Sequence, residues 1–390
     1  MDSREKKIKV CHVITRFIIG GAQENTLLTV RGLAENPCYE VTLVTGPSPG
    51  PEGDLRYQIK ETDRFNFIEI RELQRAIGLY KDICAFFQLV RLFKKERYDI
   101  IHTHSSKAGI LGRLAAKWVR TSTIVHTIHG LPFHQYQNRI VNAFYIVSEF
   151  IAARCCDRLV TVSDAMSTQA CKARIAPRDK FVTIRSGMPL ESFLEVKKDT
   201  ALKQQLGIQE NELVIGKIAR LFYLKGHRFL FDVATQIVQE VPHIKFLLLG
   251  DGILYESFKK ELTEKGLLER FVFTGLVMPE DISRYISIMD CLVHFSLREG
   301  LAKAIVQALA GKVPVVTFDL DGAPEVVQDG VNGFLISVQA SELIKEKIVL
   351  LCKNHDLRKK MGTNGPKAVY PLYKWQVMVE RIDELYQKMV

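Results

Sequence analysis

KVCHVI at residues 9–14 is followed by the loop glycines Gly20 and Gly21 and by a helical stretch at 22–33. A continuous apolar run without polar alternation is typical of a parallel strand that is buried on both faces. Further strands are expected at 41–44 (VTLV), 99–102 (DIIH), 123–129 (TIVHTIH) and 158–162 (RLVTV). The segment 107–117 (KAGILGRLAAK) is the expected helix after the strand at 99–102. Alternating strands and helices predict an α/β fold with a doubly wound sheet.

The pattern starts again after Lys180. An apolar segment at 181–184 (FVTI) leads through a polar stretch to further expected strands at 213–218 (LVIGKI), 244–249 (IKFLLL), 272–274, 290–294 and 313–317 (VPVVT). A chain of 390 residues is too long for one ordinary core. We therefore expect an N-terminal domain at 1–187, a second domain at 188–373, and a last helix at 374–390 that packs back on the first.

The net charge of +10 is confined to the first half of the chain. Residues 1–190 hold 28 Lys and Arg against 18 Asp and Glu, while the remainder holds 26 of each class. Such asymmetry suits an anionic substrate, an anionic membrane or nucleic acid, and a basic surface kept for solubility is the alternative. No motif that reads RNA or DNA is present, so we expect no nucleic acid partner.

The segment 83–97 (ICAFFQLVRLFKKER) mixes large apolar and basic side chains. It predicts a helix that lies on an anionic membrane surface, and an ordinary amphipathic helix packed on the sheet is the alternative. Residues 1–9 show no signal peptide, and the eight cysteines have neither disulfide nor zinc spacing. We expect a cytoplasmic protein that can attach to the inner face of the membrane.

Two cations follow a predicted strand in 216–226 (GKIARLFYLKG). Arg220 and Lys225 lie five residues apart and can clamp a diphosphate, one as a planar fork and one as a point charge. The alternative is a pair of solvated loop cations. The segments 247–252 (LLLGDG) and 273–277 (FTGLV) lie at the ends of two further strands. Their backbone polar groups can lie beside a planar ring of a ligand in the cleft.

The segment 298–314 (REGLAKAIVQALAGKVP) carries the strongest signal. Glu299 precedes a predicted helix at 302–310, and the free N–H groups of its first turn, at 301–304, can bind an anion. Gln307 lies two helical turns beyond Glu299, so both polar groups can face one ligand. The alternatives are an ordinary carboxylate at a helix start and a polar residue on a solvated face.

Histidines cluster in the first half at His102, His104, His126, His129 and His134. The spacings could suggest metal pairs, but no Asp, Glu or Cys of ligand spacing accompanies them, so no metal is expected. His129 ends an apolar strand, where its imidazole can hydrogen-bond a substrate hydroxyl or a leaving phosphate. A histidine with only a structural role is the alternative.

Taken in order, these pieces resemble the retaining, nucleotide-sugar-dependent glycosyltransferases of family four. The matching pieces are Gly20-Gly21, 102–109 (HTHSSKAG), His129-Gly130, Val162-Ser163, 184–193 (IRSGMPLESF), Arg220, Lys225, 250–252, 273–275, 299–316 and 322–336 (GAPEVVQDGVNGFLI). The resemblance covers nearly the whole chain. It implies the GT-B fold, in which two doubly wound, Rossmann-like domains face each other across a cleft.

The resemblance also implies roles for individual residues. Arg220 and Lys225 neutralise the leaving diphosphate, Glu299 contacts the donor sugar, and His129 lines the reaction centre. The implied donor-binding residues are Gly20, Gly21, Arg220, Lys225, Gly250, Val277, Glu299, Leu301, Ala302, Lys303, Ala304 and Gln307, and those of the acceptor side are His104, Ser105, Lys107 and His129. The implied partners are a nucleoside diphosphate sugar and a glycan or lipid-linked acceptor, with no cofactor.

Three positions depart from the family pattern. Gln307 stands where a glutamate usually holds the ribose, Ser186-Gly187 replaces Asn-Gly, and Ala302-Lys303 differs from the common variants. We expect a retaining, metal-independent hexosyltransferase of cell-surface polysaccharide or glycolipid synthesis, because Asp319-Leu320-Asp321 is expected to lie away from the clamp. The alternatives are a nucleotide-sugar epimerase of the same fold and a degenerate nucleotide-sugar-binding protein.

Overall fold

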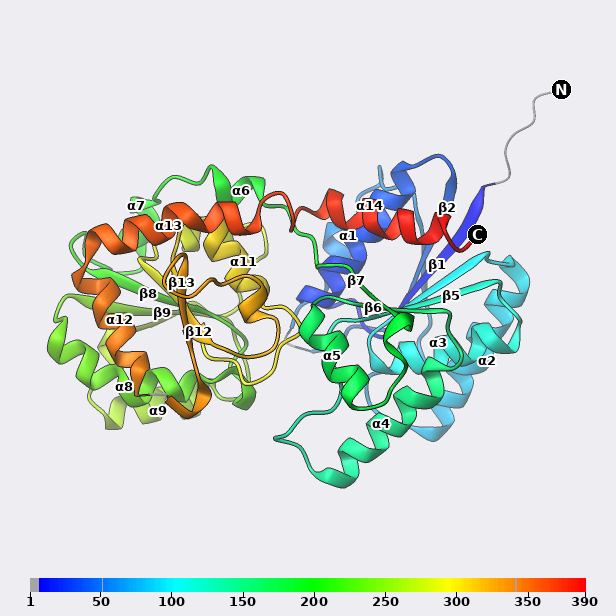
Figure 1. Ribbon diagram of the computed structural model, residues 1–390, viewed down its shortest axis with the longest axis horizontal. Coiled ribbons are helices and arrows are strands. Elements are labelled where there is room, and N and C mark those ends of the chain that lie inside the picture. The colour runs from blue at the N-terminus through cyan, green and yellow to red at the C-terminus, as the bar shows by residue number, and fades with distance from the viewer. Residues whose placement is uncertain (1–6, 51, 341) are drawn as a thin grey trace. The chain divides into compact units, whose positions relative to one another are not determined.

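The computed structural model describes residues 7–50, 52–340 and 342–390. The chain divides into two compact units (Figure 1). Unit 1 comprises Met1–Met188 and Lys374–Val390, and unit 2 comprises Pro189–Tyr373. Each unit is a parallel sheet with helices on both faces, which confirms the predicted α/β, Rossmann-like fold.

Unit 1 contains a seven-stranded parallel sheet in the order β3-β2-β1-β4-β5-β6-β7. The strands are β1 (Ile8–Ile14), β2 (Tyr39–Thr45), β3 (Asn66–Glu69), β4 (Ile100–His104), β5 (Thr123–Ile128), β6 (Arg158–Thr161) and β7 (Phe181–Thr183). Every residue of β4 and β5 is buried, their His and Thr side chains included, as expected for parallel strands that are covered on both faces.

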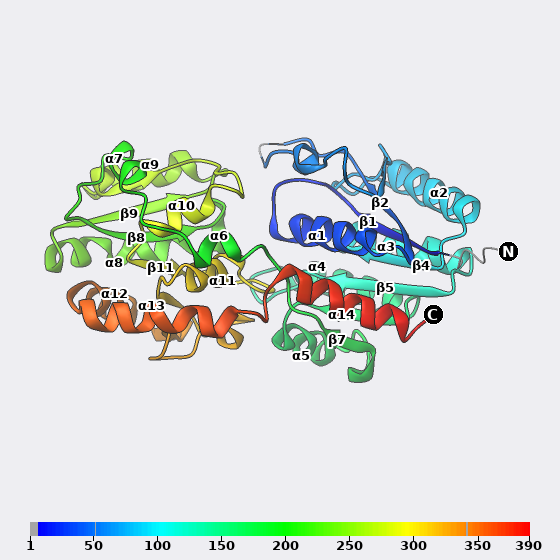
Figure 2. The same ribbon diagram turned by 90° about the horizontal axis from the view of Figure 1, so that it is seen from above.

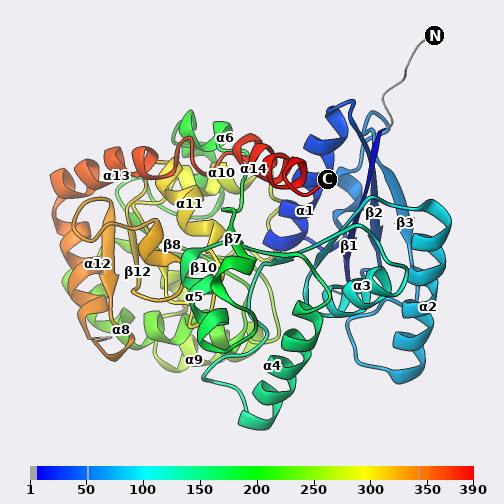
Figure 3. The same ribbon diagram turned by 45° about the vertical axis from the view of Figure 1, so that its right-hand side comes forward.

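Helices cover both faces of this sheet. They are α1 (Gly21–Glu35), α2 (Leu79–Glu96), α3 (Ser106–Trp118), α4 (Arg139–Ala153), α5 (Asp164–Lys172) and α14 (Trp375–Gln387). Helices α1 and α14 lie side by side on one face (Figure 2), and their apolar side chains share a core with β1. On the other face α3 packs between α2 and α4 (Figure 3). The predicted return of the last helix to the N-terminal unit is therefore observed.

Unit 2 contains a six-stranded parallel sheet in the order β10-β9-β8-β11-β12-β13. The strands are β8 (Leu213–Ile218), β9 (Ile244–Leu249), β10 (Phe271–Phe273), β11 (Cys291–His294), β12 (Val315–Phe318) and β13 (Gly333–Ile336). The helices are α6 (Glu191–Leu194), α7 (Thr200–Gln205), α8 (His227–Glu240), α9 (Tyr255–Glu264), α10 (Ile282–Ser287), α11 (Lys303–Ala310), α12 (Leu343–Lys353) and α13 (His355–Val369).

Each sheet reverses its strand order at one place. In unit 1 the reversal lies between β1 and β4, and in unit 2 it lies between β8 and β11. Loops diverge to opposite faces at such a point, so the crevice beyond the carboxyl ends of the two strands is where doubly wound sheets bind ligands. The topology thus selects two places to search for a site, one in each unit.

Candidate active site

The reversal point of unit 2 brings two of the expected site residues together. Lys225 follows β8 and Glu299 follows β11, and the Nζ atom of Lys225 donates a hydrogen bond of 2.5 Å to Oε1 of Glu299. The two side chains are only 21% and 24% exposed, so the pair is partly withdrawn from water. Residues 74 positions apart in sequence therefore form one charged centre.

The loop that carries Lys225 lies directly against the end of β11. The backbone N–H of Leu297 donates to the carbonyl of Leu224 at 2.9 Å. Gly226 has a φ of 64°, and a Cβ at that position would lie 1.8 Å from the carbonyl oxygen of Phe295. Glycine is required there by both conformation and space, so the approach of the two loops is built into the backbone.

Arg220 lies in the same loop and is exposed. Its guanidinium carbon is 5.0 Å from the ring centroid of Phe222, a cation–π distance. The ring orients the guanidinium, and its positive charge stays exposed at the carboxyl ends of the strands. An exposed, oriented guanidinium is what a diphosphate clamp needs.

Glu299 is held as a carboxylate. Burial by itself raises the pKa of this carboxyl, but the Lys225 ammonium and the imidazole of His294 outweigh burial and hold the pKa below its usual range. The backbone N–H of Glu299 also donates to Oδ2 of Asp321 at 2.7 Å. Asp321 was expected to lie away from the clamp, and that expectation is wrong, because the loop after β12 returns beside the loop after β11 at the same sheet edge.

A second group of nitrogen-bearing side chains is buried near the Lys225–Glu299 pair, and the sequence analysis did not identify these residues. Lys217 in β8 is 0% exposed, and its Nζ has no hydrogen-bond partner among the described residues. Burial, helped by the charge of Lys225, lowers the pKa of the Lys217 ammonium to about 7. A lysine inside an apolar strand segment was the available signal, because a buried cation needs a functional or structural reason.

Two histidines belong to the same group. Nε2 of His294 approaches Oε1 of Glu299 to 3.4 Å without the alignment of a hydrogen bond, and His227 opens α8. Neither imidazole makes a hydrogen bond within the described part of the chain. Burial lowers the pKa of both, that of His227 to about 2, so both rings are neutral at pH 7.

Helix α11 begins at the same edge, one residue later than expected. Its N-cap is Ala302, which has extended backbone and no side chain able to cap the first turn. Gln307 is only 5% exposed, and every residue from Ala304 to Ala310 is buried. The alternative that Gln307 is a polar residue on a solvated face is therefore wrong, because the residues of α11 around it are buried. Whether the Gln307 amide meets a ribose stays a prediction.

In unit 1, the expected acceptor-side residues lie around the ends of β4 and β5. Nδ1 of His104 lies 3.1 Å from Nε2 of His129. The hydroxyl of Ser105 is bonded to the hydroxyl of Thr15 at 2.8 Å. Lys107 forms an ion pair of 2.6 Å with Asp82 and also donates to the carbonyl of Ala76. Its charge is thus already balanced within the unit.

The two glycines of the first loop stand at the start of α1, which begins at Gly21 with Gly20 as its N-cap. Gly20 has a φ of 175°, which is extended backbone open to any residue. No atom outside the neighbouring residues lies within 4 Å of a Cβ built at Gly21. The pair therefore leaves open space at the helix start, and neither backbone conformation nor crowding requires glycine at Gly21.

Three buried histidines, His12, His102 and His104, have ring nitrogens within 4.8 Å of one another. The rings of His102 and His104 are stacked, as are those of His12 and His104. Their ring nitrogens are engaged within the protein: Nδ1 of His12 lies 2.9 Å from Nε2 of His104, and His102 is hydrogen-bonded to the hydroxyls of Tyr386 and Thr127. His126 bonds to the hydroxyl of Thr103 instead, so the suggested pairing of His126 with His129 is not formed.

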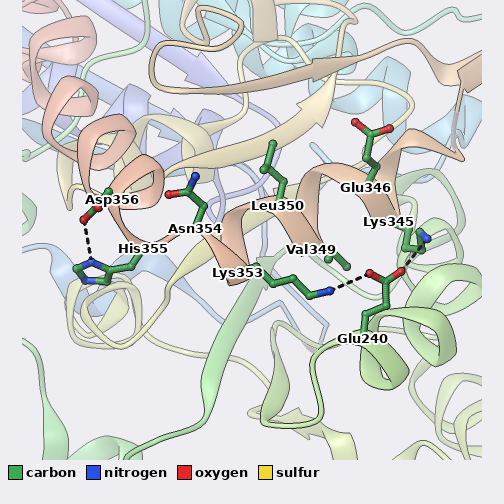
Figure 4. A pocket seen from close by; sticks show the side chains of 9 residues that line it. All are labelled: Glu240, Lys345, Glu346, Val349, Leu350, Lys353, Asn354, His355 and Asp356. Carbon is green, nitrogen blue, oxygen red and sulfur yellow. Dashed lines mark hydrogen bonds and ion pairs between the residues drawn. The ribbon is translucent and has the colours of Figure 1, made fainter.

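The hollow shown in Figure 4 lies elsewhere in unit 2. Glu240, at the end of α8, accepts from Lys345 at 2.9 Å and from Lys353 at 3.2 Å across it. Since β9 begins just after Glu240, this hollow lies at the amino edge of the sheet, opposite to the edge where doubly wound sheets bind ligands. Its charges are paired with each other, so it is not the candidate site.

Sequence comparison covers both units in turn. The family described as "Glycosyltransferase Family 4" matches residues 19–192, and the family described as "Glycosyl transferases group 1" matches residues 198–368. The second match contains Arg220, Lys225 and Glu299, and the first contains His104 and His129.

Curated relatives extend over most of the chain. It is 29% identical over 394 residues to the UDP-Gal:alpha-D-GlcNAc-diphosphoundecaprenol alpha-1,3-galactosyltransferase of Escherichia coli, with 100% of this chain and 99% of the relative covered. It is 24% identical over 336 residues to the capsular polysaccharide biosynthesis glycosyltransferase CapM of Staphylococcus aureus, covering 84% and 87%. The epimerase alternative finds no support among these relatives.

Solved structures share the fold. Anabaena Alr3699/HepE, determined in complex with UDP and glucose, aligns with a TM-score of 0.81 at 21% identity over 97% of this chain and 99% of its own. WaaG, a glycosyltransferase involved in lipopolysaccharide biosynthesis, aligns with a TM-score of 0.77 at 14% identity over 96% and 99%. With two family matches, the relatives and two Rossmann-like sheets in agreement, the chain belongs to the family 4 type of GT-B glycosyltransferases.

Proposed function

We propose that the protein transfers a hexose from a UDP-sugar to a lipid-linked glycan acceptor, with retention of configuration and without a metal ion. The observation that carries this proposal is the Lys225–Glu299 pair at the strand-order reversal of unit 2. The named activity of the Escherichia coli relative, which spans the whole chain, supports a UDP-sugar and a diphosphate-linked lipid acceptor. Unit 2 would bind the donor and unit 1 the acceptor.

The cations at this edge suit a departing diphosphate. Arg220 at the surface, Lys225 at the edge and Lys217 beneath it form a gradient of positive charge along β8 and its loop. Fixed positive charges that meet the charge developing on a leaving group are the largest single source of catalysis in many enzymes. These three cations supply what a divalent ion otherwise supplies, which supports a metal-independent reaction.

Glu299 is suited to hold the sugar rather than to exchange protons. Its carboxylate is ionised at pH 7 and can accept hydrogen bonds from sugar hydroxyls. The side chain of Asp321 accepts a hydrogen bond from the Glu299 backbone N–H and so acts on the loop that carries Glu299. Gly250 and Val277, in the loops after β9 and β10, would lie beside the nucleotide base.

A membrane-bound acceptor agrees with the surface of unit 1. Helix α4 exposes Ile140 (80%), Phe144 (58%) and Val147 (54%), and basic Arg139 and Arg154 stand at its two ends. An apolar face with flanking cations is the pattern of a helix that lies in a membrane interface. No helix among the described residues is long and apolar enough to cross a bilayer.

Only part of the segment 83–97 agrees with a membrane-binding role. In α2, which packs on α3, Ala85, Leu89 and Phe93 are buried, so the alternative of an ordinary packed amphipathic helix describes that part of it correctly. The exposed apolar residues lie toward the start of the helix, at Leu79 (80%), Tyr80 (79%) and Phe87 (58%). We place the membrane surface on α4 and the first half of α2.

The test is a transfer assay with the purified full-length chain, a panel of UDP- and GDP-sugars and a polyprenyl diphosphate-linked N-acetylglucosamine. The expected result is product formation with one UDP-hexose, in the presence of a chelator, with an α-linkage in the product by NMR. Failure to transfer or hydrolyse any donor, combined with tight UDP binding, would support the nucleotide-binding alternative instead.

A further inference from the structure

Three imidazoles of unit 1, those of His12, His104 and His129, form one continuous hydrogen-bonded row that begins at Tyr386 in α14. Nδ1 of His12 lies 2.9 Å from Nε2 of His104, and Nδ1 of His104 lies 3.1 Å from Nε2 of His129. At the other end, the hydroxyl of Tyr386 lies 3.4 Å from Nε2 of His12. His12 and His104 are 0% and 1% exposed, so water does not interrupt the row at these two members.

A side branch leaves this row at Tyr386. Its hydroxyl lies 2.5 Å from Nδ1 of His102, and Nε2 of His102 lies 2.7 Å from the hydroxyl of Thr127. The rings come from two strands, β1 and β4, from the residue after β5, and from helix α14, which are far apart in sequence. The docking of the last helix on unit 1 therefore completes the row.

Burial keeps all of these rings neutral. It lowers the pKa of His12 to about 3 and that of His129 to about 4, and it lowers those of His102 and His104 well below the usual value. A neutral imidazole has one N–H donor and one bare acceptor nitrogen. In an unbroken row every bond must therefore run in the same direction, so one end determines the tautomer of every member.

The distances at Tyr386 decide that direction. Phenolic O–H donors make the shorter hydrogen bonds, and N–H donors to oxygen make longer ones. The 2.5 Å contact is thus the O–H of Tyr386 donating to Nδ1 of His102, and the 3.4 Å contact is Nε2–H of His12 donating to the Tyr386 oxygen. Continuing outward, Nε2–H of His104 donates to Nδ1 of His12, and Nε2–H of His129 donates to Nδ1 of His104.

We propose that Tyr386, His12 and His104 are positioning residues that hold His129 in its Nε2–H tautomer and so present its bare Nδ1 as a hydrogen-bond acceptor for a substrate hydroxyl. In this state His129 receives a hydrogen bond and does not donate a proton to the leaving diphosphate. The substrate part of this inference rests on the proposed function, while the tautomer part stands on unit 1 alone.

The test is ¹⁵N NMR of the full-length protein labelled at histidine, which distinguishes the protonated from the bare ring nitrogen of each imidazole. In the wild type, His12, His104 and His129 should all show Nε2–H. In Tyr386→Phe the buried Nε2–H of His12 has no acceptor, so the row should reverse and all three should show Nδ1–H. Tyr39→Phe is the matched control, because the Tyr39 hydroxyl contacts Asp383 and Gln387 and no imidazole.

Turnover provides the second measurement. Tyr386→Phe should lose about tenfold in kcat, the scale of one hydrogen bond in the transition state, with UDP affinity unchanged. An Nδ1–H form of His129 in the wild type, an unchanged tautomer in Tyr386→Phe, or the same reversal in Tyr39→Phe would each overturn the proposal. If no donor is turned over, the proposed function fails, while the tautomer reversal is still measured and decides the inference separately.

Discussion

Lys225 and Glu299 neutralise each other across 2.5 Å. A diphosphate that enters beside Lys225 therefore competes with a carboxylate that is already in place, and a sugar hydroxyl that reaches Glu299 competes with an ammonium. Binding of a whole nucleotide sugar satisfies both groups at once, whereas a free diphosphate or a free sugar satisfies only one. If the proposed donor site is correct, we expect this relationship to favour the joined donor over either part alone.

Removing the ammonium should be costly for catalysis. Lys225→Ala is expected to lower turnover by about 10²–10³-fold, the range observed when one preorganised group that stabilises transition-state charge is lost. The measurement is kcat with the donor identified in the transfer screen. Lys345→Ala is the control, since Lys345 pairs with a glutamate at the opposite edge of the same sheet. Equal turnover in both variants would contradict the role given to Lys225.

Lys217 should reduce the stability that the fold would otherwise have at neutral pH. Its pKa falls from 10.5 to about 7, so the unfolded chain binds the extra proton between these values and the folded chain does not. The penalty is complete below pH 7 and fades as pH rises toward 10.5. Lys217→Met is therefore expected to raise the free energy of unfolding by a few kcal/mol at pH 7, at about 1.4 kcal/mol per pKa unit.

The difference in unfolding free energy between Lys217→Met and wild type should be smaller at pH 9.5 than at pH 7. Denaturant unfolding of both proteins at the two pH values measures it. The comparison of two chains at each pH cancels the other groups that titrate in this range. A constant difference between the two proteins, or a less stable variant at pH 7, would show that Lys217 is paired in solution.

Asp321 should act on activity through the loop of Glu299. Its side chain accepts from the Glu299 backbone N–H at 2.7 Å, and its φ of 54° makes Gly and Asn the tolerated replacements. Asp321→Gly removes the acceptor and should lower turnover about tenfold, whereas Asp321→Asn keeps an acceptor oxygen and should lose much less. The measurement is kcat of the two variants. Equal losses of turnover would show that the negative charge of Asp321 matters rather than its hydrogen bond to the Glu299 loop.

Gln307 should tolerate an apolar replacement better than a charged one. The side chain is 5% exposed, so Gln307→Glu places a carboxylate in a packed helix and is expected to cost about 2 kcal/mol or more in unfolding free energy. Gln307→Met keeps the volume without the charge and should fold normally. If the amide holds a ribose, calorimetry should show weaker UDP binding by Gln307→Met; unchanged affinity would remove Gln307 from the nucleotide site.

The apolar face of α4 should bind anionic vesicles. The double variant Ile140→Glu with Phe144→Glu removes two of its most exposed apolar side chains and adds two negative charges. We expect wild type to co-sediment with phosphatidylglycerol vesicles at low salt and to release at high salt, and the variant not to bind. Leu350→Glu, at an exposed apolar position of α12, is the control. Vesicle binding by the double variant would place the membrane surface elsewhere.

Much of the fold could be predicted because parallel strands that are buried on both faces have almost no alternative composition. The segments that became β1, β4, β5, β8 and β9 each stand in the sequence as a short run rich in Val, Ile and Leu. The bounds of β8 and β9 match the expected segments. Those of β1, β4 and β5 differ by one or two residues, because helix and strand termini depend on local hydrogen bonds that a hydrophobic pattern does not encode. Helix α11 begins at Lys303 for this reason.

The candidate site was only partly predictable. Arg220, Lys225 and Glu299 stand in loops directly after strands, where polar residues in a doubly wound sheet point to a ligand. Lys217 was missed because it lies inside a strand segment, where one polar residue is easily taken for an exposed one. Asp321 was misplaced because sequence distance from the clamp is no guide to which loops share a sheet edge.

The sequence by itself determined the kind of protein: two α/β units, cations after one strand, a glutamate before a helix, and a row of histidines along the first half. Tertiary structure alone decided which of these groups meet. Strand order joins Lys225 to Glu299, packing around α11 buries Gln307, and the docking of α14 supplies the hydroxyl of Tyr386 to His12 and His102. The physical reason is that periodicity specifies which face of an element is buried, whereas hydrogen bonds between side chains depend on which elements become neighbours in the sheet.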